Sequence, residues 1–332
     1  MLCILYVNAV ATLLGVAGML VERTLPTTTT SRRWLWCAVI VITLTIPPIY
    51  QANHRSSVAD VLDHQVIGSS LGHAFGPASL TAFDQGLSAW VLSLNPIVNQ
   101  FWMIASAMLV LWGLATAARV WFLVRSSRRG ETAHAPSVVD GVPVLVTDSI
   151  GPATVGVLRS RVLVPRWVLA LPGVQRRYVL RHEEEHRRSH DALLLFVASL
   201  TLILTPWNLA LWWQLQRLRL AVEMDCDNRV VSALGDANAY GELLFKVAQA
   251  ASRGPRLQPA FLGSGMLERR LTALLAPTPL RHVQKFLLPA VALGLLFVVL
   301  SMPHPMPSPS NDAHGAMTSG AATATYTHSA TR

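Results

Sequence analysis

The chain has 332 residues, of which 52% are hydrophobic and only 14% are charged. A soluble domain usually carries about a quarter charged residues, so this composition favours an integral membrane protein. The formal net charge of +9 comes mainly from arginines that flank apolar runs. The sequence lacks a zinc-finger, RNP or helix-turn-helix pattern, so direct nucleic-acid binding is not expected. The three cysteines form no local pairs, which argues against a disulfide framework.

Four apolar runs come close to the ~20 residues that a helix needs to cross a bilayer. They are Met1–Val21, Trp34–Tyr50, Phe101–Val124 and Phe286–Met302. Basic residues are concentrated between the first and second runs and between the third and fourth runs. Because loops rich in Lys and Arg usually lie in the cytoplasm, both of these segments are expected to be cytoplasmic. The expected organisation is a three-span region (1–125), a cytoplasmic domain (126–283), a fourth span (284–302) and a disordered external tail (303–332). The N-terminus then lies outside a bacterial inner membrane.

The cytoplasmic segment begins with strand-like pieces and continues with helices. The predicted strands are Val142–Thr147, Ala153–Leu158 and Val162–Pro165, with a turn-rich link at Asp148–Pro152. The predicted helices are Pro172–Arg188, Leu218–Leu234, Tyr240–Ala251 and Met266–Leu275. This order predicts a mainly α protein whose cytoplasmic α+β domain contains a small sheet.

A zinc-peptidase motif lies in the first of these helices, at His182-Glu183-Glu184-Glu185-His186. His182 and His186 are four residues apart, which places both imidazoles on one helix face. Two such histidines can hold Zn²⁺ and leave a position for water. Glu183 would then take a proton from that water as the general base. The competing interpretation is a charged, solvated helix face.

A third metal ligand is needed, and two positions compete for it. His190 extends the same series, but helix drift carries it away from a point between the first two histidines. Glu223 is favoured, with Asp227 one turn later to accept a hydrogen bond from a ligand imidazole. Cys226 could also bind zinc, although a small buried residue is the favoured reading. The alternative for Glu223 and Asp227 is an acidic helix start with surface ion pairs.

The apolar run Leu193–Trp213 would cross the membrane if it were one helix, and would separate Glu223 from His182. Thr205-Pro206-Trp207-Asn208 interrupts it, because proline breaks a helix interior and asparagine favours a turn. We therefore expect a membrane-associated hairpin of two short helices over residues 193–213.

Metalloproteases of this type hold their peptide substrate along a sheet edge by strand addition. The candidate edge is Ala153–Leu158, with Thr154, Val155 and Gly156 as substrate-strand residues. An ordinary buried strand is the alternative. No residue stands out as the group that stabilises the oxyanion.

Together, these segments resemble the BlaR/MecR-type membrane metallopeptidases. The resemblance rests on residues 152–157, Val162–Pro165, His182–Asp191, the Pro206-Trp207-Asn208 turn, Glu223–Asp227, Tyr240–Leu244 and Glu268–Leu271. It implies a gluzincin fold with one catalytic Zn²⁺ on His182, His186 and Glu223, and with Glu183 as base. It also implies regulatory signalling by cleavage of the chain itself or of a winged-helix repressor of the BlaI/MecI type.

The tail is too short for the family's penicillin-binding sensor domain, and it has no Ser-x-x-Lys motif. Direct sensing of a beta-lactam by acylation is therefore not expected, and a signal would enter through the external loop Gln51–Gln100 or a partner. Two other functions compete with antibiotic-resistance regulation. One is a quality-control protease of the Ste24/HtpX type, and the other is a non-catalytic membrane transducer. Membrane lipid and a protein substrate are the expected partners.

Overall fold

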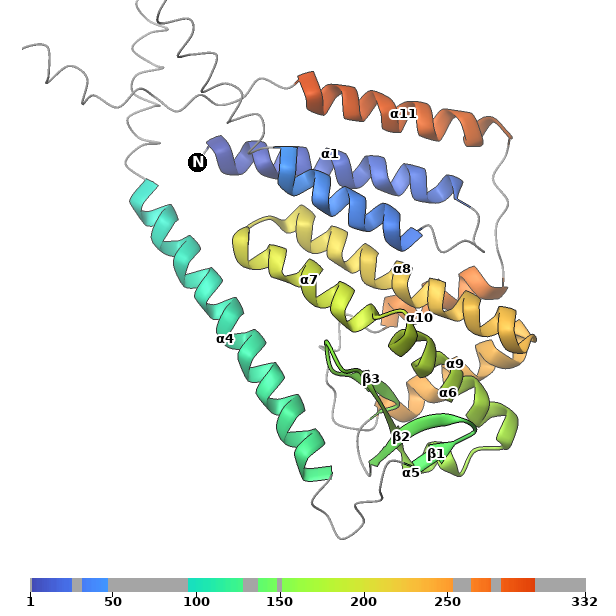
Figure 1. The fold of residues 1–332 in the computed structure, drawn as a ribbon. Coiled ribbons are helices and arrows are strands. Elements are labelled where there is room, and N and C mark those ends of the chain that lie inside the picture. The colour runs from blue at the N-terminus through green and yellow to red at the C-terminus, as the bar shows by residue number, and fades with distance from the viewer. Residues whose placement is uncertain are drawn as a thin grey trace, which may run out of the picture.

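The structure is a computed structural model that describes residues 2–25, 32–46, 95–127, 137–147, 151–252, 264–275 and 282–301. Figure 1 shows a stack of long helices that ends in a small sheet at one side of the molecule. Most of the predicted external loop, the turn at 148–150 and the tail at 303–332 lie outside the described residues.

Three long apolar helices coincide with three of the four predicted spans. They are α1 (Leu2–Thr24), α4 (Asn95–Ser127) and α11 (His282–Ser301), and each contains a stretch long and apolar enough to cross a membrane. The second predicted span is a helix over residues 32–46, and residues 47–50 are outside the described part of the chain. The helix 32–46 is buried through Trp36, Val39 and Ile40 in a core shared with α1 and α8.

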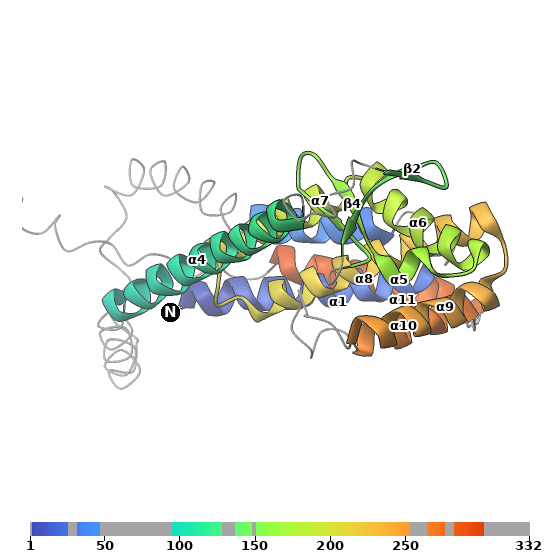
Figure 2. The same ribbon diagram turned by 90° about the horizontal axis from the view of Figure 1, so that it is seen from below.

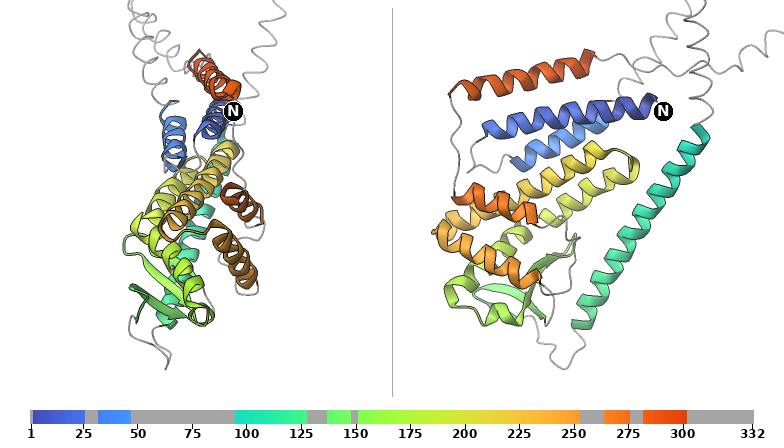
Figure 3. Two further views of the ribbon diagram at one scale, coloured as in Figure 1. Left: turned by 90° about the vertical axis from the view of Figure 1, so that its right-hand side faces the viewer. Right: turned by 180° about the vertical axis from the view of Figure 1, so that it is seen from behind.

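The expected break in the apolar run is confirmed. Helix α7 (Asp191–Leu204) stops before Thr205, and helix α8 (Leu209–Leu234) begins after Asn208, whose side chain accepts a hydrogen bond from the Leu211 amide. The two helices lie side by side as a hairpin (Figures 1 and 3). Helix α4 runs obliquely past the hairpin (Figure 2). Its Trp102 and Ser106 donate to carbonyls at the end of α7.

The prediction of two short hairpin helices is wrong for the second helix, because α8 continues for 26 residues without a break. Two polar side chains in its first half have partners inside the protein. Gln214 donates to the Ala11 carbonyl of α1, and Arg217 forms an ion pair with Glu22. With these groups satisfied, the helix passes directly from the apolar region to Glu223 and Asp227.

The sheet is mixed, with the strand order β1-β2-β4-β3. Its strands are β1 (Ser137–Val139), β2 (Val142–Thr147), β3 (Ala153–Val155) and β4 (Arg161–Pro165). Strand β1 was not predicted, although the Asp140-Gly141 turn, with positive φ at both residues, is typical of a two-residue hairpin. Strands β2 and β4 are parallel, whereas both outer strands are antiparallel to their neighbours.

Strand β3 is shorter than predicted, and Gly156 is not part of it. Gly156 has a φ of 102°, and a Cβ at this position would lie 2.7 Å from the Arg159 carbonyl oxygen. The chain therefore turns after Val155, which corrects the prediction of a strand through Leu158. Thr154 and Val155 do lie in an outer strand of the sheet.

The remaining helices pack around the sheet and the second half of α8. They are α5 (Arg166–Leu169), α6 (Gly173–Arg188), α9 (Ala237–Ser252) and α10 (Ser264–Leu275). Two buried cores result. One joins α1, the helix 32–46, α7, α11 and the first half of α8, and the other joins the sheet with α6, α9 and the second half of α8. Glu223 lies on α8 where one core gives way to the other.

Candidate metal centre

Two imidazoles on α6 converge on one point. His182 and His186 stand one turn apart, and their Nε2 atoms are 3.2 Å from each other. Each side chain is only 13% exposed. The preceding turn of α6 is held in place by Tyr178, Val179 and Leu180, which are buried in the core beneath the sheet.

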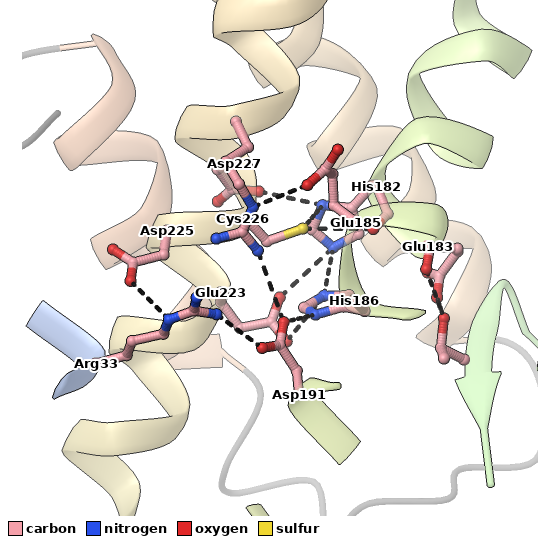
Figure 4. A network of polar contacts seen from close by, with 12 residues as sticks. Arg33, His182, Glu183, Glu185, His186, Asp191, Glu223, Asp225, Cys226 and Asp227 are labelled. Carbon is pink, nitrogen blue, oxygen red and sulfur yellow. Dashed lines mark hydrogen bonds and ion pairs between the residues drawn. The ribbon is translucent and has the colours of Figure 1, made fainter. Parts of the chain in front are cut away.

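Glu223 completes a set of three donors. Its Oε2 lies 3.6 Å from His182 Nε2, and its Oε1 lies 3.8 Å from His186 Nε2. Four donors arranged tetrahedrally at zinc–ligand distances of about 2.0–2.1 Å are about 3.3 Å apart. The Nε2–Nε2 separation of 3.2 Å is close to that value, and Glu223 places one carboxylate oxygen 3.6 Å from one Nε2 atom and the other oxygen 3.8 Å from the second. Two imidazoles and a carboxylate therefore enclose a point that fits a metal ion. Figure 4 shows the carboxylate of α8 facing both rings.

Cys226 is also close to the two histidines, and a metal could in principle be shared by His182, His186 and Cys226. The thiol also interacts with His186. On His182, however, it lies 3.3 Å from Nδ1, which is on the opposite side of the ring from Nε2. It also donates to the His182 carbonyl. Glu223 approaches the Nε2 atoms that face each other, so we favour Glu223 over Cys226 as the third donor.

The outer nitrogen of each imidazole has its own partner. His186 Nδ1 is 2.8 Å from Asp191 Oδ2, and Asp191 is the first residue of α7. His182 Nδ1 is 2.9 Å from the hydroxyl of Tyr240 on α9, which in turn donates to Asp227 Oδ1. With a proton on each Nδ1, the Nε2 lone pairs point toward Glu223, as a metal requires.

Asp227 therefore supports His182 mainly through Tyr240. Its Oδ1 is 3.5 Å from His182 Nδ1, which is longer than an ordinary hydrogen bond of this kind. Arg270 on α10 donates twice to Asp227, at 2.7 and 2.8 Å, and lies 2.9 Å from Glu223 Oε2. Arg270 thus holds both Glu223, the third donor, and Asp227, which supports His182 through Tyr240.

Glu183, the predicted base, lies on the side of the histidines that faces β3 (Figure 4). The Thr154 hydroxyl is 2.8 Å from the Glu183 carbonyl oxygen and 3.0 Å from its carboxylate Oε2, so its single proton is directed at this residue. Glu183 is only 7% exposed. The outer strand and the base are thus joined by a direct contact.

The charges of the centre reinforce one another. Burial would lower the pKa of His182, but Cys226 and Glu223 outweigh it and raise that pKa to about 10. Burial would raise the pKa of Glu223, but Arg270 and the two histidines hold it well below its usual range. The site thus combines a carboxylate with imidazoles that bind protons tightly, and a metal would have to displace those protons.

The interpretation of Glu184 and Glu185 as a solvated helix face is wrong. They are only 3% and 6% exposed. Glu184 accepts hydrogen bonds from Arg187 and Arg188, whereas Glu185 pairs with Arg181 and Arg229. These ion pairs replace the apolar contacts that such a helix would otherwise make.

His190 does not join the two motif histidines. It follows the end of α6 with a φ of 54°, and its side chain is exposed. The left-handed residue turns the chain so that Asp191 comes back toward His186.

Three partners of the centre were not predicted: Asp191, Tyr240 and Arg270. Asp191 is the first residue of α7, the helix after the motif helix, and an acidic residue at a helix start was a signal that could have identified it. Tyr240 and Arg270 come from helices that reach the site only through tertiary packing, and their spacing in the sequence contains no signal of that contact.

Comparison with known families supports the arrangement. The model of the family described as BlaR1 peptidase M56 matches residues 2–274 of the 332. The match runs from α1 nearly to the end of α10 and includes both helices that carry the three donors. No curated protein and no solved structure matched the chain. Since the family model covers most of the sequence, the chain belongs to the BlaR1 peptidase M56 family.

Proposed function

We propose that this membrane metallopeptidase is a zinc-dependent endopeptidase with His182, His186 and Glu223 as its metal ligands. The observation that carries the proposal is the convergence of two Nε2 atoms and one carboxylate within 3.2–3.8 Å. Zinc held there would supply a Lewis acid that polarises a water molecule and the substrate carbonyl. The fourth position of a tetrahedral site would be open to the water molecule or to the substrate carbonyl oxygen.

In this proposal, the protein groups around the metal have distinct tasks. Glu183 accepts the proton of the attacking water and returns it to the leaving amine. Thr154 orients the Glu183 carboxylate from the neighbouring strand. Asp191 orients His186, while Tyr240 and Asp227 orient His182. A substrate strand that pairs with the outer edge of β3 would pass beside the base.

The proposed substrate is a cytoplasmic protein: the chain itself or a winged-helix repressor, within a regulatory pathway. The basic residues at the end of α1 (Arg23) and at the start of the helix 32–46 (Arg32 and Arg33) favour a cytoplasmic location for these two helix ends. Arg33, at the start of this helix, contacts Asp191 beside the motif helix. The start of the helix 32–46 and the metal centre therefore lie on the same side of the membrane region, which supports a catalytic domain in the cytoplasm.

The full-length protein purified in detergent is expected to contain one zinc ion per chain and to cleave protein substrate. β-Casein, an unfolded protein, serves as the probe, and fragments of the chain itself are followed on the same gels. Removal of zinc with a chelator should abolish cleavage, and added Zn²⁺ should restore it, because His182, His186 and Glu223 provide a site that fits the ion. Metal-free protein that cleaves at the original rate would contradict the proposal.

The Thr154→Val substitution is expected to reduce kcat/KM about fivefold without loss of zinc. It removes one hydrogen bond to the base, which is worth about 1 kcal/mol. Ser160→Ala is the matched control, because Ser160 donates only to the Gly156 carbonyl in the exposed turn after β3. Equal cleavage rates for Thr154→Val and Ser160→Ala would show that the hydroxyl of Thr154 does not assist Glu183.

A further inference from the structure

Arg33 connects the membrane region to the metal centre. It lies in the first turn of the helix 32–46 and donates through Nη1 to Asp191 Oδ1 at 3.1 Å, although the two residues are 158 positions apart. The Arg33 side chain is 14% exposed and that of Asp191 is 3% exposed. Figure 4 shows Arg33 entering from the blue helix and pointing between α7 and α8.

The two oxygens of Asp191 have different tasks. Oδ2 is 2.8 Å from His186 Nδ1, whereas Oδ1 accepts the hydrogen bond from Arg33. A second cation, Arg229, is farther away, with its Nη2 3.7 Å from Oδ2, and its Nε donates to Glu185. The direction of the buried carboxylate is therefore set on one side by Arg33 and on the other by the imidazole.

From this geometry, we infer that Arg33 is a positioning residue that orients the ligand His186 through Asp191. The inference rests on the proposed metal site. A carboxylate that has lost its partner on Oδ1 can rotate toward Arg229, and the proton on His186 Nδ1 then loses its acceptor. The Nε2 lone pair is no longer held toward Glu223, so metal affinity falls.

The contact also gives the membrane helices a mechanical connection to the metal. Arg33 is followed by Trp36, Val39 and Ile40, which pack in the core that contains α1 and α8. A shift of the helix 32–46 along its axis would move the guanidinium relative to Asp191. The site would therefore respond to the position of a membrane helix without any contact between that helix and the substrate.

Arg32 provides a matched control for Arg33. It has the same charge, occupies the same helical turn and is 8% exposed. Its guanidinium has other partners: Nη2 donates to the Leu25 carbonyl, and Nη1 is 4.0 Å from Met224 Sδ. Removal of its charge tests general damage to this region without removal of the hydrogen bond to Asp191.

The test measures zinc affinity by chelator competition on full-length protein in lipid nanodiscs after zinc removal. Arg33→Gln is expected to weaken zinc binding about tenfold, at the lower end of the range for outer partners of metal ligands. Arg33→Lys should restore affinity to within about threefold of wild type, because the contact is a single N–H···O bond. Arg32→Gln should bind zinc like wild type. Of these three variants, Arg33→Gln alone should differ from wild type in the visible absorption spectrum of the Co²⁺-loaded protein.

A double-mutant cycle with Asp191→Asn separates a positioning role from a structural one. If Arg33 acts through Asp191, Arg33→Gln should add no further loss to Asp191→Asn. The double variant also serves if Arg33→Gln alone does not fold, because it leaves no unpaired charge at position 191. Asp225, whose Oδ2 lies 3.9 Å from Arg33 Nε, loses that contact in both variants, so its effect cancels in the cycle. Additive losses, or equal losses in Arg32→Gln and Arg33→Gln, would overturn the inference.

The same measurements distinguish the two proposals. Wild-type protein that binds no zinc would overturn both the proposed function and the role of Arg33. Wild-type protein that binds zinc and cleaves β-casein, with no effect of Arg33→Gln on either property, would overturn the role of Arg33 alone. Arg33-dependent zinc binding without any cleavage would support the positioning role and contradict the endopeptidase.

Discussion

Substitution of Glu183 by glutamine is expected to reduce cleavage about 10²–10⁴-fold and to leave zinc content unchanged. A general base contributes about 10²–10⁴-fold to such reactions, and an amide cannot accept the proton. Glutamine keeps the shape of the side chain and an oxygen that can accept from Thr154 Oγ1. The measurement is initial cleavage of β-casein together with the zinc content of the same samples.

Glu184→Gln is the matched control for this prediction. Glu184 is the next residue of α6 and is equally buried, but its carboxylate accepts from Arg187 and Arg188 at the outer side of the helix. It should cleave within about threefold of wild type. A Glu183→Gln enzyme that retained more than a tenth of the activity would exclude Glu183 as the base. A loss of zinc in that variant would instead indicate a structural role.

The parts of the centre that were predictable depend on local geometry. A spacing of four residues on a helix brings His182 and His186 together whatever the rest of the chain does. The break at Pro206 allowed α8 to return Glu223 to the same side, and the structure contains that break. Apolar length predicted α1, α4 and α11 for the same reason, because a membrane span is a property of one continuous segment.

The unpredicted parts depend on contacts between distant segments. The length of α8 was underestimated because Gln214 and Arg217 looked like the end of an apolar helix, whereas α1 and its neighbours satisfy both. Glu184 and Glu185 have arginine partners at helical spacing on α6 itself, at positions 181, 187 and 188, but their burial depends on the packing of α6 against α8, which contributes Arg229. Buried ion pairs of this kind have no counterpart in hydrophobic periodicity.

The position of the centre between two cores has a consequence for regulation. The first half of α8 belongs to the apolar core with α1, α7 and α11, whereas the second half belongs to the core of the sheet. Glu223 is therefore on a helix that is rigidly anchored in both. Any rearrangement of the membrane helices that moves α8 would displace the third donor relative to α6, on which the two histidines lie.

Replacement of Glu223 by alanine is expected to weaken zinc affinity by more than about 100-fold, beyond the range typical of outer partners. Only two imidazole donors would remain, and Arg270 would face the vacated position with its charge unbalanced. Cys226→Ser should keep zinc affinity within about threefold, because the thiol approaches His182 from the Nδ1 side. Chelator competition on full-length protein measures both variants.

The absorption spectrum of the Co²⁺-substituted protein tests whether Glu223 or Cys226 is the third metal ligand without a measurement of affinity. A thiolate ligand would give the Co²⁺ protein an intense near-ultraviolet charge-transfer band, whereas two imidazoles and a carboxylate would not. We expect this band to be absent in wild type and Cys226→Ser alike. Glu223→Gln, which keeps the side-chain volume, guards against misfolding of the alanine variant. Full zinc affinity in both Glu223 variants, or a band that Cys226→Ser removes, would transfer the third ligand position to Cys226.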